Sequence, residues 1–378
     1  MRICIIRNAE GEMNAQLERV ASALFETKND FFLITRNRDA SEKGTVIKKE
    51  IIIDNKKIDN YEIQLPAIIG GGIKNVLPVL EFKKILSKWL EDNLEKYDAI
   101  HAIDYDVGSV ALKICKKNNK KLIYHIADFY ADSRLSIPAF AKKILRQKEY
   151  TIINHADATI ICSEDRLKQI EGSFPKKVIV VHNTPARKQM ITKEDIRLNN
   201  KDNLMLTYVG GLEKKRFIDK VISVVKEQPN YKLILAGSLG DARESFEHID
   251  KIENITYVGK QPYEKALELY QSADVMFAIY DPDHPNHRYS AANKVYEAML
   301  MGKAIIVAKN TGMDKIVEEE NMGYTIDFDQ QDLSELLTHI SNNREELYEK
   351  SLNAYHAYKK YSWEEMKKRL ILLYEELD

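Results

Sequence analysis

The sequence is poor in cysteine, and this shortage restricts the chemistry open to it. Its 378 residues include three cysteines, Cys4, Cys115 and Cys162, in apolar surroundings and at unrelated spacings. An odd, scattered set of thiols fits neither a disulfide framework nor a cysteine-based metal site. The sequence therefore favours reduced thiols in a cytoplasmic protein.

Long apolar runs and low-complexity segments are also lacking. No apolar run approaches the roughly 18 residues that a membrane-spanning helix needs. The N-terminal segment MRICIIRN is interrupted by Arg7 and leads into polar sequence. This pattern is typical of a first buried strand and not of a signal peptide.

An excess of charge of either sign is missing too. Lys and Arg number 57 against 58 Asp and Glu, so the formal net charge is −1. Such a balance argues against a nucleic-acid-binding protein that depends on bulk charge. The length is about twice that of a typical domain, which favours two domains.

Strand-like apolar runs alternate with segments of 3.6-residue apolar period in both halves of the chain. This alternation predicts a doubly wound α/β protein. A polar segment without periodicity, residues 186–203, is the predicted linker. It separates a first domain, residues 1–185, from a second domain, residues 204–355. Residues 356–378 are predicted to form a C-terminal helix, with no strand after it.

The most informative stretch is Asn293–Ala308, NKVYEAMLMGKAIIVA, which reads as a helix, a glycine stop and a buried strand. A strand, DVMFAIY, and a polar loop, DPDHPNHRY, precede it. Such strand–loop–helix units bind phosphates and sugars at the carboxyl edge of a parallel sheet. Asn293, Lys294 and Glu297 share one helix face. There the Glu297 carboxylate would accept hydrogen bonds from ribose hydroxyls, and the Lys294 ammonium would offset phosphate charge.

This stretch resembles the nucleotide-sugar signature of the retaining GT-B glycosyltransferases of family 4, which ends in E-A-M/L-A-x-G-K-P-V-I. One departure is Tyr289, which stands where the family usually has an earlier Glu; the variant N-K-x-x-E-A-M is common among bacterial polysaccharide transferases. The resemblance implies a GT-B fold. Two Rossmann-like domains would face each other across a cleft, and the C-terminal helix would cross back to the first domain.

A second motif, YVGGLEKKRFIDKVI, resembles the family's G-R/G-L…K/R-G segment. Gly210 and Gly211 would let a ligand approach the backbone, and Lys215 and Arg216 at a helix entrance suit a diphosphate. Phe217 replaces the usual glycine. Because Gly211 has no side chain where many members carry an Arg, Arg216 is expected to carry the phosphate. The alternative is a solvated basic helix start after a tight turn.

Two further segments complete the expected donor site. YVGKQPYEKALELYQSADV resembles a family segment whose strand end, here Gly259, Lys260 and Gln261, would present backbone groups to the nucleobase. The loop before the Asn293 helix would line the sugar pocket through Arg288 and Tyr289.

In the first domain, LIYHIADFYADS resembles the family segment L-I-Y-D-x-H-D-L-Y-P-E. His125 takes the place of the first Asp and Ala127 that of the usual His, while Asp128 keeps its place. The resemblance implies that His125 hydrogen-bonds the transferred sugar or stabilises charge at its anomeric carbon. Asp128 would orient His125, bind the acceptor or cap the next turn. The alternative is a strand-terminal histidine with a structural role.

Two metal-like motifs are set aside. Asp281-Pro282-Asp283 has the D-x-D form, but that motif belongs to a glycosyltransferase fold with one nucleotide domain. His284 and His287 are three apart in a Pro-rich loop, which makes a weak ligand pair. We therefore expect no metal and no cofactor. The donor substrate would be a nucleoside diphosphate sugar, with UDP favoured over GDP.

Two basic-apolar stretches, Lys74–Trp89 and Pro138–Lys148, suggest peripheral contact with an anionic membrane. Cations interleaved with apolar side chains suit such a surface. The alternative is ordinary amphipathic helices whose apolar sides belong to the domain core.

Together these features predict a retaining, metal-independent hexosyltransferase acting on a glycan or lipid-linked acceptor in surface polysaccharide or capsule synthesis, at the inner face of the plasma membrane. One alternative is a GT-B sugar-nucleotide epimerase, which would turn over the donor without an acceptor. Another is a catalytically silent homologue that acts as a partner subunit and binds the donor without transfer.

Overall fold

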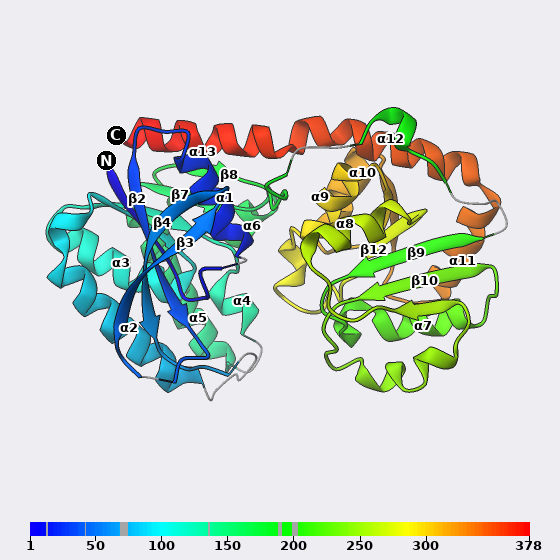
Figure 1. Cartoon of the computed structure of the whole chain (residues 1–378), viewed down its shortest axis with the longest axis horizontal. Helices are drawn as coiled ribbons and strands as arrows, with labels where there is room; N and C mark the ends of the chain where they lie inside the picture. The colour runs from blue at the N-terminus through cyan, green and yellow to red at the C-terminus, as the bar shows by residue number, and fades with distance from the viewer. Residues whose placement is uncertain (13, 42, 69–74, 135–136, 188–190, 199–202) are drawn as a thin grey trace. The chain divides into compact units, whose positions relative to one another are not determined.

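The computed structural model describes the chain except for residues 13, 42, 69–74, 135–136, 188–190 and 199–202. The chain forms two compact units, each with its own sheet and hydrophobic core. Unit 1 comprises residues 1–182 and 366–378, and unit 2 comprises residues 183–365 (Figure 1). The predicted linker, 186–203, is grouped with unit 2, although residues 188–190 and 199–202 of it lie outside the described residues.

Unit 1 is built on an eight-stranded sheet in which every strand pair is parallel except β3–β4. In spatial order the strands are β3 (Val46–Ile53), β4 (Lys56–Gln64), β2 (Asp30–Asn37), β1 (Arg2–Arg7), β5 (Ala99–Ile103), β6 (Lys121–His125), β7 (Ala158–Ile161) and β8 (Val178–Val180). The central strands are buried on both faces, as expected for a parallel sheet covered by helices.

Helices cover both faces of this sheet. The helices of unit 1 are α1 (Ala15–Leu24), α2 (Val76–Asp92), α3 (Tyr105–Asn118), α4 (Tyr130–Ser133), α5 (Ala139–His155), α6 (Arg166–Gln169) and α13 (Trp363–Leu377) from Met366 onward. The neighbours α2, α3 and α5 pack side by side. Tyr124 of β6 contacts Glu149 of α5, whereas the adjacent His125 points to the opposite face, toward His101.

The β3–β4 hairpin was not predicted. Its strands are joined by Asp54 and Asn55, both with positive φ, which is the backbone of a type I′ turn. The segment VIKKEIII reads ambiguously because Lys48, Lys49 and Glu50 interrupt its apolar pattern. Pairing with β4 at the sheet edge, which no local pattern reveals, makes it a strand.

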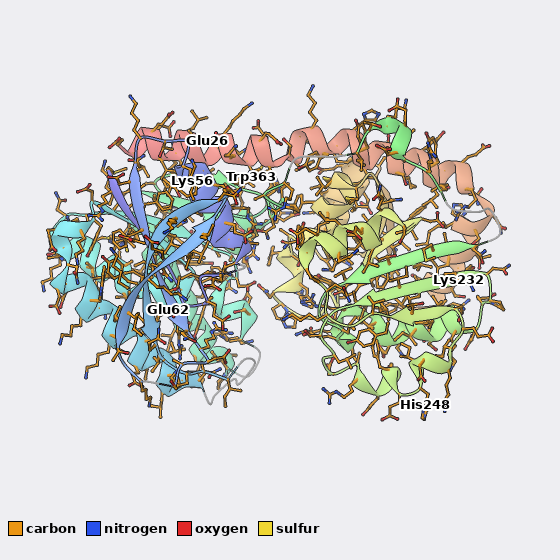
Figure 2. All side chains as sticks on the ribbon, viewed as in Figure 1. Glu26, Lys56, Glu62, Lys232, His248 and Trp363 are labelled. Carbon is orange, nitrogen blue, oxygen red and sulfur yellow. The ribbon has the colours of Figure 1, made fainter. Side chains whose placement is uncertain are left out.

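The chain ends in α13, which begins later than the predicted helix over residues 356–378, and α13 belongs to unit 1 from Met366 onward. Lys367 forms an ion pair with Glu26, labelled in Figure 2 beside this helix. The Met366 sulfur accepts a hydrogen bond from the backbone N–H of His182. Residues 344–361, by contrast, form α12 (Arg344–Tyr361) in unit 2.

Unit 2 has a six-stranded parallel sheet. In spatial order its strands are β11 (Ile255–Tyr257), β10 (Tyr231–Ala236), β9 (Leu204–Val209), β12 (Val275–Ala278), β13 (Ala304–Ala308) and β14 (Gly323–Ile326). Its helices are α7 (Ile218–Lys226), α8 (Tyr263–Gln271), α9 (Asn293–Leu300), α10 (Met313–Glu319), α11 (Gln330–Asn342) and α12.

The strand order of unit 2 reverses between β9 and β12. From β9 the chain proceeds outward through β10 and β11, and it then returns to β12 on the other side. Ligands of open α/β sheets bind at such a switch point, outside the carboxyl ends of the strands. The loops after β9 and β12 and the start of α9 are therefore the place to look for a ligand site. The corresponding reversal in unit 1 lies between β1 and β5.

Candidate active site

The loop after β9 lies so close to the loop after β10 that neither tolerates a side chain. An added Cβ on Gly237 would lie 1.8 Å from the Gly210 carbonyl oxygen, and Gly237 has a φ of 137°. An added Cβ on Gly210 would meet the Lys294 Nζ at 2.9 Å and the Tyr208 hydroxyl at 3.1 Å. Glycine at these two positions therefore allows both loops and the Lys294 ammonium to come close together at the switch point. Phosphate-binding loops use glycine in the same way.

Two tyrosines hold Arg216 at this loop. The Arg216 guanidinium donates to the Tyr208 hydroxyl at 3.2 Å and to the Tyr280 hydroxyl at 3.4 Å. It also lies over the Tyr280 ring, 5.1 Å from its centroid, and its Nε is 3.3 Å from a Glu213 carboxylate oxygen. Tyr208 precedes Gly210 and Tyr280 follows β12, so residues from both sides of the switch point converge on one cation.

Lys294 approaches the same tyrosine from α9. Its Nζ lies 4.9 Å from the centroid of the Tyr208 ring, and the residue is 8% exposed. Burial works against its charge, yet the pKa of Lys294 is raised on balance, chiefly by the facing Tyr208. Two cations, Arg216 and Lys294, therefore meet at the Tyr208 side chain, and this concentration of positive charge suits a diphosphate.

Glu297 lies one helical turn beyond Lys294 and is buried with it. Burial raises the pKa of the Glu297 carboxyl, and nearby Lys294 partly offsets the rise. Tyr270 and Tyr263 of α8 lie beside this carboxylate and also lower its pKa. Lys294 and Glu297 thus lie together on α9, and their roles in donor binding stay a prediction.

The other predicted donor-site residues surround this centre at varying depth. Lys215 is half-exposed, 3.3 Å from Glu213, and its carbonyl accepts the Asp281 N–H. Asn293 is exposed at the first residue of α9, and Arg288 is exposed in the preceding loop, where it donates to the Pro282 carbonyl. Tyr289 lies in the same loop and is half-buried.

The β11 end joins the centre through backbone contacts. The Gly259 carbonyl accepts the Gly237 N–H at 2.8 Å, and the Tyr257 hydroxyl donates to the Gly237 carbonyl at 2.9 Å. Lys260 is exposed, whereas Gln261 donates its side-chain amide back to the Val258 carbonyl. The amide of Gln261 is therefore engaged in its own turn.

The loop after β12 packs on itself. The His284 and His287 rings stack with centroids 4.2 Å apart, and the His287 Nδ1–H donates to the Asp281 carbonyl at 3.0 Å. Burial lowers the pKa of His287 to about 4. Within the described residues no three His, Cys, Asp or Glu side chains are placed to hold a metal ion.

In unit 1, His125 ends β6 and is 2% exposed. Its Nδ1 lies 3.2 Å from the His101 Nε2, and burial holds the pKa of His125 well below its ordinary value. His125 thus stands at the end of its strand, and its role in the reaction stays a prediction. The partner, His101 on β5, was not predicted.

Asp128 lies on the exposed turn after β6, and a neighbouring carboxylate, Asp104, was missed by the sequence analysis. Asp104 follows β5 with a φ of 69° and accepts the N–H groups of Ala127 and Asp128 at 3.0 and 3.1 Å. Burial raises the pKa of Asp104 to about 6. Its position directly after the buried strand AIHAI is the signal that could have found it.

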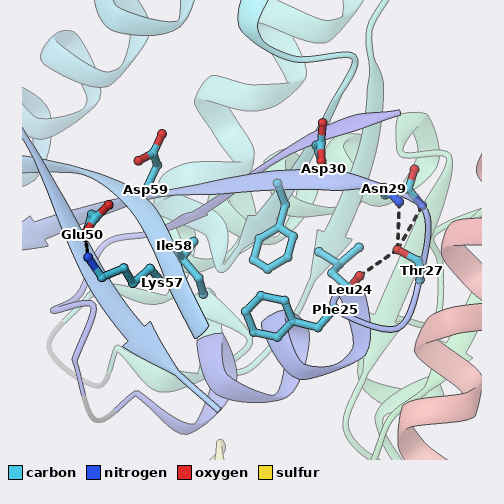
Figure 3. A pocket seen from close by; sticks show the side chains of 10 residues that line it. Leu24, Phe25, Thr27, Asn29, Asp30, Glu50, Lys57, Ile58 and Asp59 are labelled. Atoms are coloured by element: carbon cyan, nitrogen blue, oxygen red, sulfur yellow. Dashed lines mark hydrogen bonds and ion pairs between the residues drawn. The ribbon is translucent and has the colours of Figure 1, made fainter. Parts of the chain in front are cut away.

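A pocket of about 370 Å³ lies at the other edge of the same sheet (Figure 3). It is lined by the end of α1, the start of β2 and the β3–β4 hairpin. Two of its carboxylates are already paired, Glu50 with Lys57 and Asp59 with Lys48. Because parallel α/β sheets bind ligands at their carboxyl edge, we assign this pocket no part in the site.

The two stretches predicted to face a membrane differ from expectation. Phe82 is fully buried and cannot reach the surface, whereas Trp89 is half-buried and packs on Tyr61 with ring centroids 4.6 Å apart. Arg146 is paired with Asp132 at 2.5 Å within unit 1. Phe82 and Arg146 are therefore engaged within unit 1, and membrane contact through these stretches stays a prediction.

Other apolar side chains of the same stretches are exposed. On α2 these are Val76, Leu77 and Leu80, and on α5 they are Phe140 and Ile144. Lys84, Lys88, Lys143 and Lys148 are exposed beside them. Lys74 lies outside the described residues. None of the described helices combines the length and apolarity required to cross a bilayer.

Comparisons with known proteins agree with this geometry. Residues 13–184 match the family description "Glycosyltransferase Family 4", and residues 189–373 match "Glycosyl transferases group 1". An uncharacterized glycosyltransferase of Methanocaldococcus jannaschii is 23% identical over 261 residues, covering 68% of this chain and 70% of that protein.

Solved structures share the fold. Sucrose-phosphate synthase from Thermosynechococcus elongatus superimposes with a TM-score of 0.75 at 17% identity, covering 100% of this chain and 99% of the other. The HepE protein of Anabaena, in complex with UDP and glucose, gives a TM-score of 0.70 at 15% identity, with 99% of each chain covered. The predicted GT-B class, with two Rossmann-like domains, is thereby confirmed.

Proposed function

We propose that the chain, whose two halves match glycosyltransferase families, transfers a hexose-type sugar from a nucleoside diphosphate sugar, with retention of configuration, to a glycan or lipid-linked acceptor. The observation that carries the proposal is the meeting of Arg216 and Lys294 at Tyr208, where the two glycine loops leave space for no side chain. The presence of UDP and glucose in the Anabaena structure supports UDP as the nucleotide.

In the proposed reaction each site residue has its own role. Arg216, Lys215 and Lys294 stabilise the diphosphate as the bond between the sugar C1 and the β-phosphate oxygen breaks. Glu297 accepts hydrogen bonds from the ribose hydroxyls. The acceptor oxygen bonds to C1, and its proton passes to the departing diphosphate. His125 and Asp128 of unit 1 act on the sugar and the acceptor.

Donor screening tests this proposal directly. A ligand that binds only the folded state raises the unfolding midpoint in proportion to RT ln(1 + [L]/Kd), so about 2.7 kcal/mol is gained at 100 times Kd. UDP and UDP-hexoses are expected to raise the midpoint, and acceptor-dependent release of UDP should follow. A protein that binds no nucleoside diphosphate, or that consumes donor equally without acceptor, would contradict the proposal.

Chelation is expected to leave transfer unchanged. In the proposed mechanism cations of the chain, and no divalent ion, offset the charge on the diphosphate. Initial rates measured with EDTA and with added Mn²⁺ should agree. Loss of transfer in EDTA and recovery with Mn²⁺ would instead assign Asp281 and Asp283 a metal.

A membrane-bound acceptor would require unit 1 to reach a bilayer, and we propose that the start of α5 does so. Phe140 is 72% exposed and Ile144 52%, with Lys142, Lys143 and Lys148 around them and no acid from Pro138 to Lys148. Each Lys near an anionic surface contributes about 1 kcal/mol. The attraction decays within a Debye length of about 8 Å at physiological salt, so binding should weaken as salt rises.

Replacing Lys142, Lys143 and Lys148 with Glu should therefore release the protein from vesicles rich in phosphatidylserine. The free energy of binding to these vesicles should weaken by at least about 3 kcal/mol. Arg146 is left intact because Asp132 pairs with it. The matched control reverses Lys113, Lys116 and Lys117, which are exposed on α3 without exposed large apolar neighbours on that helix. Equal cosedimentation of both variants, or of the wild type with neutral and anionic vesicles, would leave a soluble acceptor as the better assignment.

A further inference from the structure

A buried row of three side chains connects the C-terminal helix to the end of β6 in unit 1. The Tyr374 hydroxyl lies 2.7 Å from the His101 Nδ1, and the His101 Nε2 lies 3.2 Å from the His125 Nδ1. Tyr374 and His101 are fully buried, and His125 is 2% exposed. The row joins residues 273 positions apart in sequence, and of its three members the sequence analysis singled out His125 alone as a site residue.

All three groups are neutral near pH 7. Burial lowers the pKa of His101 to about 3. Burial, His101 and the guanidinium groups of Arg19, Arg7 and Arg166 hold the pKa of His125 well below its ordinary value. Burial raises the pKa of Tyr374, so it stays a phenol. Each histidine therefore carries one ring proton, and which nitrogen holds it decides what the ring can do.

The phenol fixes the direction of the row. Among the described residues the His101 Nδ1 is the only hydrogen-bond partner of the Tyr374 hydroxyl. A buried hydroxyl that does not donate loses a hydrogen bond with nothing to replace it. Tyr374 must therefore donate to Nδ1, which leaves the His101 proton on Nε2. The reverse direction would place a proton on Nδ1 and orphan the phenol hydrogen.

The same reasoning passes to the next ring. The His101 Nε2–H donates to the His125 Nδ1, so the one proton of His125 lies on Nε2. We propose that Tyr374 and His101 are positioning residues that hold His125 as the Nε2–H tautomer, so that it acts as a hydrogen-bond donor to an oxygen of the donor sugar. In this state the ring cannot remove a proton from the acceptor.

The role of His125 as a hydrogen-bond donor to the sugar rests on the proposed transferase function. The assignment of its tautomer rests only on the buried contacts with His101 and Tyr374. A neutral N–H donor at the carboxyl edge of the sheet suits a hydroxyl or ring oxygen of the sugar. It also agrees with the proton of the acceptor passing to the diphosphate. The last helix then contributes to the site through a side chain that touches no substrate.

Long-range ¹H–¹⁵N spectra of the full-length protein labelled at histidine nitrogen test the tautomer directly. The wild type is expected to show Nε2-protonated rings for both His101 and His125. Tyr374→Phe removes the donor and should change the tautomer populations of both rings. Tyr97→Phe is the matched control, because it removes a buried hydroxyl that donates to the Leu90 carbonyl in the same unit.

Kinetics provide the second readout. Tyr374→Phe should lower kcat about tenfold, the effect of one lost hydrogen bond, and leave the Kd for UDP unchanged. His125→Gln carries an amide N–H near the Nε2 position and should retain more activity than His125→Asn. A wild-type His125 protonated on Nδ1, or tautomers unmoved by Tyr374→Phe, would overturn the proposal. The predicted tautomers in a protein without transferase activity would contradict the proposed function alone.

Discussion

Replacing Arg216 with alanine is expected to weaken UDP binding about 10- to 150-fold and leave uridine binding nearly unchanged. Hydrogen bonds to charged groups contribute about 1.5–3 kcal/mol each, and the guanidinium lies at the β9–β12 switch point. Tyr208, Tyr280 and Glu213 fix it before any ligand arrives. Little ordering is then required on binding, so the interaction energy is retained.

Calorimetry with UDP, UMP and uridine measures this effect. Lys214→Ala is the matched control, because Lys214 is the neighbouring cation, is exposed and pairs with Glu244. It should change UDP affinity by less than about 0.5 kcal/mol, as is usual for a surface substitution. Equal losses for UDP and uridine in the Arg216 variant would mean that Arg216 supports the fold of the loop and does not bind the diphosphate.

Replacing Glu297 with glutamine is expected to lower donor affinity by about 1.5–3 kcal/mol. The change keeps the size of the side chain and removes the charge that makes it a strong acceptor for ribose hydroxyls. The wild type should bind UDP more tightly than 2′,3′-dideoxy-UDP, and the variant should lose this preference. A preference that survives the substitution would assign the ribose to another residue.

The protonation of Glu297 gives a second test, because a change of pH should shift UDP affinity and the free energy of unfolding in opposite directions. Because burial raises its pKa, UDP affinity should fall as pH decreases and the carboxylate becomes protonated. Its contribution to the free energy of unfolding runs the other way. That contribution is fully present below the ordinary carboxyl pKa and is lost as pH rises through the raised folded value. Glu297→Gln should flatten both dependences.

The sequence by itself determined the elements and their order. The N-terminal run RICII is the predicted first strand, β1, and the stretch Asn293–Ala308 is the predicted helix and strand, α9 and β13. These features are local, because side chains three or four apart on a helix, or two apart on a strand, share a face whatever the rest of the chain does. Lys294 and Glu297 came together for that reason.

Only the tertiary structure decided which side chains meet across elements. Tyr208 and Tyr280 converge on Arg216 because β9 and β12 are neighbours in the sheet. Gly237 is required because the loop after β10 touches Gly210. Tyr374 meets His101 because the last helix packs on unit 1. Such contacts join residues tens to hundreds of positions apart, and no local pattern encodes them.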